Sequence, residues 1–481
     1  MRIFLTGATG FIGRALSLRL LRDGHQVVAY ARDATKARAS LGGEVEIREA
    51  SSGLEQGISG CDAIINLGGE PIFVGRWTSA RKALLKESRV SLTRGLVDAI
   101  GKSSARPKVL ISTSAVGYYG DRQDERLEEG TGPGGDFLAD ICKAWEDEAN
   151  KVTAHGVRVA IVRIGLVMGQ EGGALQKMLP PFQMGVGGRL GSGRQYMPWI
   201  HLEDLVEIFA QAVTDVRFQG PINGTAPTPV TNNEFTKALG RALGRPTIFP
   251  VPSPALHLIL GEAAGALLGG QNAVPAKLLG WGFNFKHTEI GAALLGIVRP
   301  RGVEIGPAKD LPETEYLKRR GAKKRLSATT EIDAPIEEVF EFFKKAENLG
   351  AMTPPALAFD IQTKLPIPMG TGTVIDYVIR LGPVPMKWRT LIERFEPGVK
   401  FVDSQQQGPY RSWWHEHHFR AFEGRTLMED RVYFSAPFGP LGRIAEQLFI
   451  APMLQRIFAY RATAIRLRFG ASHRHESRRA A

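Results

Sequence analysis

The chain has 481 residues, more than one ordinary hydrophobic core accommodates, and this length predicts at least two domains. Its hydrophobic (43%) and charged (23%) fractions are those of a globular protein, and no uninterrupted run of roughly 18 apolar residues could span a bilayer. The net charge of +12 comes with few clusters of Lys and Arg, so the composition favours a solvated basic surface over a nucleic-acid-binding face.

Two features of the sequence indicate the cellular compartment. The chain opens directly on the strand-like segment MRIFLTG, which leaves no room for a signal peptide. Its two cysteines, Cys61 and Cys142, each lie in an apolar stretch and lack the spacing of a metal site. We therefore expect a soluble, cytoplasmic protein with reduced core thiols and no integral membrane segment.

Strand-like and helix-like segments alternate along the first 165 residues. The expected strands are RIFLTG (2–7), HQVVAYAR (25–32), DAIINLGG (62–69), PKVLISTSA (107–115) and VRVAIVRIG (157–165). Alternation of this kind predicts an α/β fold, a doubly wound parallel sheet of the Rossmann type over residues 1–165, with returning segments up to about residue 230.

A glycine-rich turn, TGATGFIG, follows the first expected strand and precedes a helix. Gly7 permits the tight turn, Gly10 lets the backbone approach a pyrophosphate, and Gly13 allows the helix to pack closely on the strand. The N-terminus of the helix supplies N–H groups and partial positive charge for phosphates. This context predicts a dinucleotide site.

The end of the second expected strand indicates which dinucleotide is bound. Arg32 lies 19 positions after Gly13, where a guanidinium could form paired hydrogen bonds with a 2′-phosphate. This position favours NADP(H). The adjacent Asp33 keeps NAD(H) as the less favoured alternative.

Several motifs of the first three hundred residues resemble the extended short-chain dehydrogenase/reductase superfamily, in particular its epimerase-like, atypical branch. They are TGATGFIG, NLGGEPI (66–72), STSAVGYYG (112–120), DFLADICKAWEDEA (136–149), GGRLGSGRQYMPWIHLEDL (187–205) and INGTAPTPVTNNEF (222–235). With the glycine turn, the resemblance implies cofactor contacts at Gly7, Thr9, Gly10, Phe11, Ile12, Gly13, Arg32, Leu67, Gly68 and Lys143.

The catalytic pattern departs from that superfamily at one position. Its chemistry uses a Tyr-x-x-x-Lys pair on one helix face and a Ser or Thr hydroxyl at the preceding strand end. Lys143 and Ser114 match the lysine and the hydroxyl, but Ala139 stands where the tyrosine belongs. We expect any hydride transfer to rely on Ser114 and Lys143, with Tyr119 or water as a substituted donor.

Further polar residues are candidates for substrate contacts in the first three hundred residues. They are Glu70, Arg163, Arg194 and His201. For His201 and the nearby Asp204 the alternative is that they cap and anchor the helix after WIHLEDL. A substrate lobe with a helical segment is expected over residues 166–297, and a linker rich in Pro, Gly and charge over 298–323.

The remaining residues predict a second domain over 324–470 and a disordered basic tail over 471–481. The order is a strand (326–333), a helix from Pro335, five strands within 372–436, and a last helix over about 441–469. This segment resembles the START-like, helix-grip superfamily (SRPBCC) of polyketide cyclases and lipid-transfer domains. The resemblance rests on ATTEIDAPIEEVFEFF, NLGAMTPP, GPYRSWWHEHHF and the terminal helix, and it implies a cavity for an apolar ligand.

The strand WWHEHHF carries two histidines on one face, because side chains alternate along a strand. His415 and His417 share that face, yet no third metal ligand is identifiable by spacing. We therefore expect no metal here. The two imidazoles either line a cavity and orient a substrate or lie on a solvated face.

Three functions follow from this sequence. The leading one is an NADP(H)-binding, epimerase- or oxidoreductase-like protein acting on a small, partly apolar metabolite, with a fused domain that binds an apolar ligand. The alternatives are a non-catalytic, NADP(H)-sensing regulator and a lipid-type carrier with a vestigial Rossmann domain. Substrate, partner and oligomeric state do not follow from the sequence.

Overall fold

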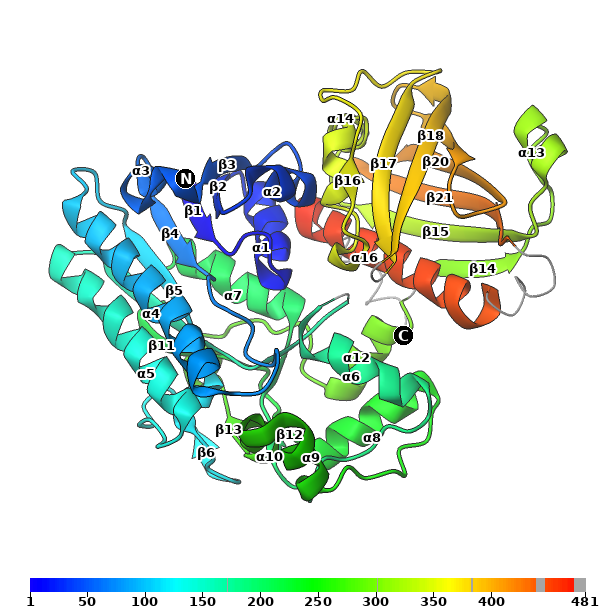
Figure 1. Ribbon diagram of the computed structural model, residues 1–481. Coiled ribbons are helices and arrows are strands. Elements are labelled where there is room, and N and C mark those ends of the chain that lie inside the picture. The colour runs from blue at the N-terminus through cyan, green and yellow to red at the C-terminus, as the bar shows by residue number, and fades with distance from the viewer. Residues whose placement is uncertain (171, 301, 382–383, 438–445, 471–481) are drawn as a thin grey trace. The chain divides into compact units, whose positions relative to one another are not determined.

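A computed structural model of the chain describes residues 1–170, 172–300, 302–381, 384–437 and 446–470 (Figure 1). The chain forms two compact units. The first comprises Met1–Leu20, Gly24–Ala34 and Glu46–Arg299, and the second Leu21–Asp23, Thr35–Val45 and Pro300–Ala481. The predicted tail over 471–481 and the predicted start of the last helix near 441 lie outside the described residues. No described helix combines the length and apolarity needed to cross a membrane.

The first unit is built on a seven-stranded parallel sheet in the order β11-β7-β5-β4-β1-β2-β3. Its strands are β1 (Arg2–Thr6), β2 (Gln26–Ala31), β3 (Glu46–Glu49), β4 (Ala63–Asn66), β5 (Val109–Ala115), β7 (Arg158–Ile164) and β11 (Gly220–Gly224). This confirms the predicted Rossmann-type fold. The strand order reverses between β1 and β4, and ligands bind at the carboxyl ends of the strands beside such a reversal.

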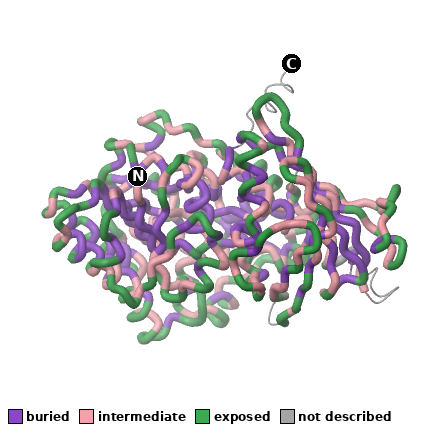
Figure 2. The backbone as a smooth tube through the Cα atoms, turned by 90° about the horizontal axis from the view of Figure 1, so that it is seen from above, coloured by how far each residue is buried: buried purple, intermediate pink, exposed green. Residues whose placement is uncertain are grey.

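Helices cover both faces of this sheet (Figure 1). They include α1 (Phe11–Arg22), α3 (Leu54–Ile58), α4 (Ser79–Lys102), α5 (Phe137–Asn150) and α7 (Leu202–Thr214). On the side of α4 and α5, the strand residues Phe4, Ile64 and Leu110 pack against Leu96 and Ile100 of α4. The strands β1, β4, β5 and β7 are buried along most of their length, because parallel strands are apolar on both faces; Figure 2 colours the whole chain by burial.

The lobe predicted after residue 165 forms around the buried ring of Trp199. Its short strands pair as β10 with β8, β12 with β9 and β13 with β6. These are β6 (Arg126–Leu127), β8 (Leu166–Met168), β9 (Tyr196–Met197), β10 (Trp199–His201), β12 (Val230–Thr231) and β13 (Asn272–Ala273). The helices are α6 (Gly173–Gln183), α8 (Asn232–Leu243), α9 (Ser253–Leu260), α10 (Gly265–Leu268), α11 (Ala276–Gly280) and α12 (Ile290–Val298).

The second unit contains an eight-stranded antiparallel sheet in the order β14-β15-β21-β20-β19-β18-β17-β16. Its strands are β14 (Val303–Pro307), β15 (Lys324–Ile332), β16 (Asp360–Ile361), β17 (Val374–Leu381), β18 (Val384–Glu396), β19 (Lys400–Gln407), β20 (Ser412–Phe422) and β21 (Arg425–Ser435). One face carries α14 (Ile336–Phe343) and α16 (Ala451–Phe469), whose Phe340 and Phe458 contact Phe419 and His415 of β20.

The predicted linker differs in structure from the expectation. Val303–Pro307 form strand β14, which pairs with Lys324–Ala328 of β15, and Glu315–Arg320 form the helix α13 with Thr314 as its N-cap. The segment reads as a linker because VEIGP is short and half-exposed, with little alternation of polarity. Its pairing with β15, which begins 17 residues after β14 ends, makes it a strand.

Candidate functional site

The glycine turn connects β1 to α1 at the carboxyl edge of the parallel sheet. Gly7 has a φ of 67°, a left-handed conformation that favours glycine. A Cβ on Gly7 would lie 2.8 Å from the carbonyl oxygen of Leu67, and a Cβ on Gly13 would lie 2.3 Å from the carbonyl oxygen of Gly7. Both positions therefore require glycine, as the dinucleotide interpretation predicts.

The ends of β1 and β4 are joined beneath this turn. The Thr6 hydroxyl donates to Asn66 Oδ1 at 2.7 Å, and the backbone N–H of Gly68 donates to Thr6 Oγ1 at 3.1 Å. These bonds hold Leu67 and Gly68 against Gly7. The structure thus brings together the predicted cofactor residues of the two strands that flank the reversal in strand order.

The other predicted cofactor residues lie around the turn. Thr9 and Gly10 are exposed at its tip, and Phe11 and Ile12 begin α1 half-buried. The Phe11 ring lies over Gly172 so closely that a Cβ there would overlap it. Arg32 is exposed immediately after β2, the strand next to β1. Its position leaves the guanidinium available to a ligand at this edge.

A buried network of polar side chains lies at the same edge, between β5, β7 and α5. Arg163 Nε and Nη2 donate to the two oxygens of Glu146 at 2.9 and 2.8 Å. The Ser114 hydroxyl donates to Glu146 Oε1 at 2.6 Å, and Arg163 Nη1 donates to Tyr119 Oη at 3.0 Å. Burial alone would lower the pKa of Arg163, but Glu146 raises it above its ordinary value. The guanidinium therefore stays charged.

Tyr119 is anchored within this network. Its side chain is fully buried, and its hydroxyl lies 2.7 Å from Asn223 Oδ1 and 3.1 Å from the carbonyl oxygen of Glu128. Burial raises the pKa of the phenol. These contacts favour an anchoring role for Tyr119 over the donor role predicted from the sequence.

Lys143 has a different partner from Ser114 and Tyr119. Its ammonium group is exposed and pairs with Asp147 Oδ2 at 2.7 Å, one helical turn along α5. One turn before Lys143, α5 carries the buried Ala139, whose side chain has no hydroxyl. The structure therefore joins Ser114 to Tyr119 through Glu146 and Arg163, and leaves Lys143 on the helix surface.

Glu146 is the residue of this site that sequence reasoning missed. The sequence indicates Arg163 only as a polar strand end, and Glu146 belongs to a run of acidic residues on a surface-like helix. The signal that was available is its position seven residues after Ala139, on the same face of α5.

The remaining candidates of the first unit, except Arg194, have structural partners. Glu70 is half-buried with its carboxylate 3.5 Å from Arg81 Nη1, and Arg194 is exposed on a loop. His201 caps α7, because its Nδ1 accepts from the backbone N–H of Glu203, and Asp204 accepts from two backbone N–H groups, those of Lys286 and His287. These bonds are those of a cap and an anchor for α7, the alternative to substrate contacts.

The histidines of β20 are buried rather than exposed on a solvated face. His415 and His417 have only 6% and 3% of their surface exposed to solvent, and each faces Asp403 and Asp430. Burial lowers the pKa of His415, and His417 adds to this shift. Burial would raise the pKa of Asp430, but Arg461 and the imidazoles hold it well below its ordinary value. The pKa directions indicate a neutral His415 beside an ionised Asp430.

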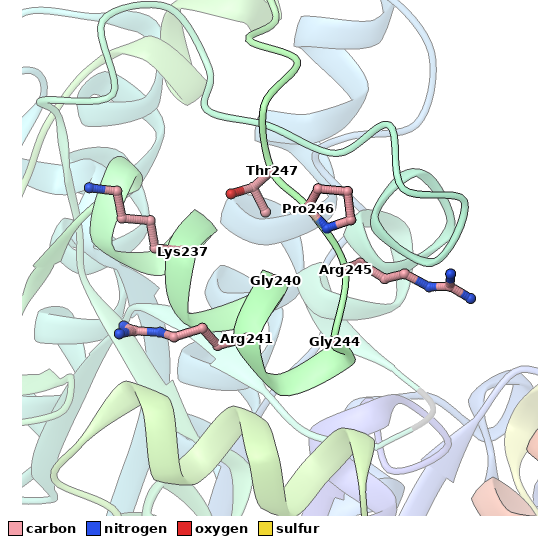
Figure 3. A pocket seen from close by; sticks show the side chains of 7 residues that line it. All are labelled: Lys237, Gly240, Arg241, Gly244, Arg245, Pro246 and Thr247. Carbon is pink, nitrogen blue, oxygen red and sulfur yellow. The ribbon is translucent and has the colours of Figure 1, made fainter.

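A surface pocket lies where α8 ends and turns into the following loop. It is lined by Lys237, Gly240, Arg241, Gly244, Arg245, Pro246 and Thr247 (Figure 3). Figure 3 shows the guanidinium of Arg245 pointing away from Lys237 and Arg241. Because the three cationic groups do not converge, the pocket lacks the arrangement of an anion site.

Two family models match parts of this chain. The NAD dependent epimerase/dehydratase family matches residues 3–223, and Domain of unknown function (DUF1731) matches residues 251–297. Among curated relatives, the epimerase family protein SDR39U1 homolog, chloroplastic, of Arabidopsis thaliana is 42% identical over 305 residues, which are 62% of this chain and 87% of that protein. The epimerase family protein YfhF of Bacillus subtilis is 36% identical over 63% of this chain and 99% of its own length.

Solved structures of epimerase proteins also resemble the first unit. The crystal structure of human epimerase family protein SDR39U1 (isoform 2) with NADPH is 34% identical and has a TM-score of 0.57, over 62% of this chain and 99% of that one. A nucleoside-diphosphate sugar epimerase from Corynebacterium glutamicum is 31% identical with a TM-score of 0.50, over 62% of this chain and 58% of its own.

Proposed function

This chain belongs to the NAD dependent epimerase/dehydratase family, and from that premise we propose that its first unit binds NADP(H) and acts on a small, partly apolar metabolite as an epimerase or oxidoreductase. The observation that carries the proposal is the left-handed Gly7 turn packed against Leu67 and Gly68 at the carboxyl edge of β1 and β4. The relative solved with NADPH supports the phosphorylated cofactor. A cytoplasmic location stays a prediction.

Cofactor preference tests the first part of this proposal. Calorimetric titration is expected to give tighter binding of NADPH than of NADH, because Arg32 pairs with the 2′-phosphate. In Arg32→Ala this preference shrinks, whereas Arg126→Ala, which removes an exposed arginine of β6, leaves it unchanged. Equal affinities of the parent protein for both cofactors would contradict the proposal.

Turnover is the second part, and it depends on Ser114 and Lys143. General acid–base catalysis is typically worth about 10²–10⁴-fold, so a site without the family tyrosine retains slow hydride transfer. Stopped-flow oxidation of bound NADPH by carbonyl substrates, including any ligand that co-purifies, is expected to slow in Ser114→Ala and Lys143→Met. If neither variant differs from the parent, the enzymatic assignment fails.

A specific observation favours a second candidate, the non-catalytic NADP(H)-sensing regulator. The Ser114 hydroxyl donates a hydrogen bond to Glu146, Lys143 pairs with Asp147, and Ala139 supplies no hydroxyl. All three groups of the superfamily's chemistry are therefore occupied or missing. NADPH that binds and stays reduced in the presence of the co-purified ligand would favour the regulator.

For the second unit we retain the proposal of an apolar-ligand-binding domain of the helix-grip type. The element order, with an antiparallel sheet between α14 and α16 in sequence, supports it, as does the aromatic lining of one face by Trp388, Trp413 and Phe434. A hydrophobic ligand bound only by the native state raises the unfolding temperature. A set of apolar ligands, none of which shifts that temperature, would count against the carrier role.

A further inference from the structure

Two histidines and two aspartates gather on three adjacent strands of the second unit. In the strand register Asp403 of β19 lies opposite His415 of β20, and Asp430 of β21 lies opposite His417. All four side chains share the face that Phe458 of α16 covers. The two imidazoles and Asp430 are less than one-tenth exposed, and the Asp403 side chain is 14% exposed.

Asp430 contacts both imidazoles from one side. Its Oδ1 lies 3.0 Å from His415 Nε2 and 2.8 Å from His417 Nδ1. His415 Nε2 is hydrogen-bonded to this oxygen, and His417 Nδ1 lies within ion-pair distance of it. Arg461 Nη2 stands 3.6 Å from the same oxygen and balances its charge.

The other nitrogen of each ring faces Asp403. Its Oδ2 lies 3.5 Å from His415 Nδ1 and 3.1 Å from His417 Nε2, and one ligand atom from each of the three residues lies within 4.8 Å of the others. Two ligands that each lie about 2.1 Å from a tetrahedral metal are about 3.4 Å apart. The spacing of the two nitrogens from the carboxylate oxygen matches that value.

Counting protons distinguishes this cluster from an ordinary hydrogen-bonded one. A neutral imidazole has one donor and one acceptor nitrogen, and an ionised carboxylate only accepts. In the tautomers that direct both N–H groups at Asp430, two nitrogen lone pairs and a carboxylate oxygen face one another. A bound cation satisfies all three at once. The alternative is a proton on His417 Nε2, with His417 Nδ1 accepting from Arg461 Nη2 at 3.2 Å.

We propose that Asp403, His415 and His417 bind a divalent first-row transition metal in the second unit. Asp430 is a positioning residue that fixes the tautomer and orientation of both imidazoles, an outer partner of the kind that metal-binding histidines use. Two imidazoles and one carboxylate form a donor set suited to Zn²⁺ and to non-haem Fe²⁺, with one or more positions left for water or substrate. The expectation of no metal at WWHEHHF is thus replaced by a testable site.

The test uses the full chain, stripped with a chelator and dialysed against Zn²⁺ or Co²⁺. One metal ion per chain is expected in the parent protein, and His415→Gln, His417→Gln and Asp403→Asn should each lower the affinity at least tenfold. His418→Gln is the matched control, because His418 lies on the same strand but the opposite face and pairs with Glu416.

A second control separates this site from the other histidine group of the described residues, His201, Glu203 and His287. Loss of the bound metal in His287→Gln but not in His415→Gln would overturn the proposal. So would equal affinity in the parent and in Asp403→Asn, which would indicate a hydrogen-bonded network only. Should the histidine variants not fold, X-ray absorption of the Zn²⁺-loaded parent decides: two imidazole nitrogens at about 2.0 Å support the site, and their absence overturns it.

Discussion

The polar cluster at the edge of the parallel sheet and the one inside the antiparallel sheet are both buried, but their protons are distributed differently. In the first unit Arg163 supplies only donors, and Glu146 accepts from Arg163 and Ser114. Each nitrogen of the guanidinium therefore meets an acceptor. In the second unit four ring nitrogens face two carboxylates, an imidazole in its neutral form supplies one proton, and Arg461 reaches only one of the ring nitrogens, His417 Nδ1.

This difference teaches how buried polar groups can be interpreted. A cluster whose donors and acceptors match is complete and holds elements together. A cluster with an excess of acceptors requires extra protons or a cation. We therefore assign a structural role to the Arg163–Glu146 pair and a ligand-binding role to Asp403, His415 and His417. Four predictions test this contrast.

The largest effect is expected from breaking the matched cluster. Arg163→Met leaves Glu146 buried without a counter-charge, and removal of one partner of a buried pair costs about 3–5 kcal/mol. Hydrogen exchange of native-state peptides from β5 and β7 measures this loss. The double variant Arg163→Met/Glu146→Leu should recover most of it, and Arg126→Met, at an exposed site, should cost little. A loss below about 1 kcal/mol in Arg163→Met would contradict the assignment.

The reactivity of the Cys142 thiol shows whether water reaches the matched cluster. It is buried on α5, and burial raises the pKa of its thiol to about 11 from an ordinary value near 9. Because the thiolate is the reactive form, alkylation at pH 8 should be about 100-fold slower in the native chain than in urea. The native rate should rise with pH until about pH 11. Peptide-level mass spectrometry checks this, and equal rates in both states would show that the site is open to solvent.

The mismatched cluster should depend on its positioning residue. Asp430→Asn removes the charge that orients both imidazoles, and loss of such an outer partner typically costs about 10–100-fold in metal affinity. Competition with a chelator measures the change in Zn²⁺ affinity. Glu429→Gln is the control, since Glu429 is the next residue on β21 and pairs with Arg431. Unchanged affinity in Asp430→Asn would mean that the rings are oriented by other contacts.

The smallest effect is expected at Tyr119. Tyr119→Phe removes the hydroxyl that contacts Asn223 and accepts from Arg163, and it should lower the free energy of unfolding of the first unit by about 1–3 kcal/mol, the usual cost of leaving buried polar partners unsatisfied. Because the phenol is an anchor, oxidation of bound NADPH should keep its rate. If Tyr119→Phe is fully folded and still oxidises bound NADPH more slowly than the parent, Tyr119 is the proton donor after all.

The sequence alone determined the elements whose signal is local. β1, β4, β5 and β7 lie within the expected strands, and the glycine turn lies between β1 and α1 as predicted. Apolar runs and a glycine that must adopt a positive φ are properties of neighbouring residues, so they can be read without knowledge of the fold. The strands from β17 to β21 were equally visible by their alternation and length.

Tertiary structure decided which distant residues meet. Asp403 becomes a partner of His415 only through the register of β19 with β20, and a register shift of one residue would move it to the opposite face. Glu146 meets Arg163 because α5 packs on β5 and β7, and Val303–Pro307 becomes a strand because β15 offers a free edge. None of these contacts can be predicted from spacing along the chain, since each depends on how two separate elements pack.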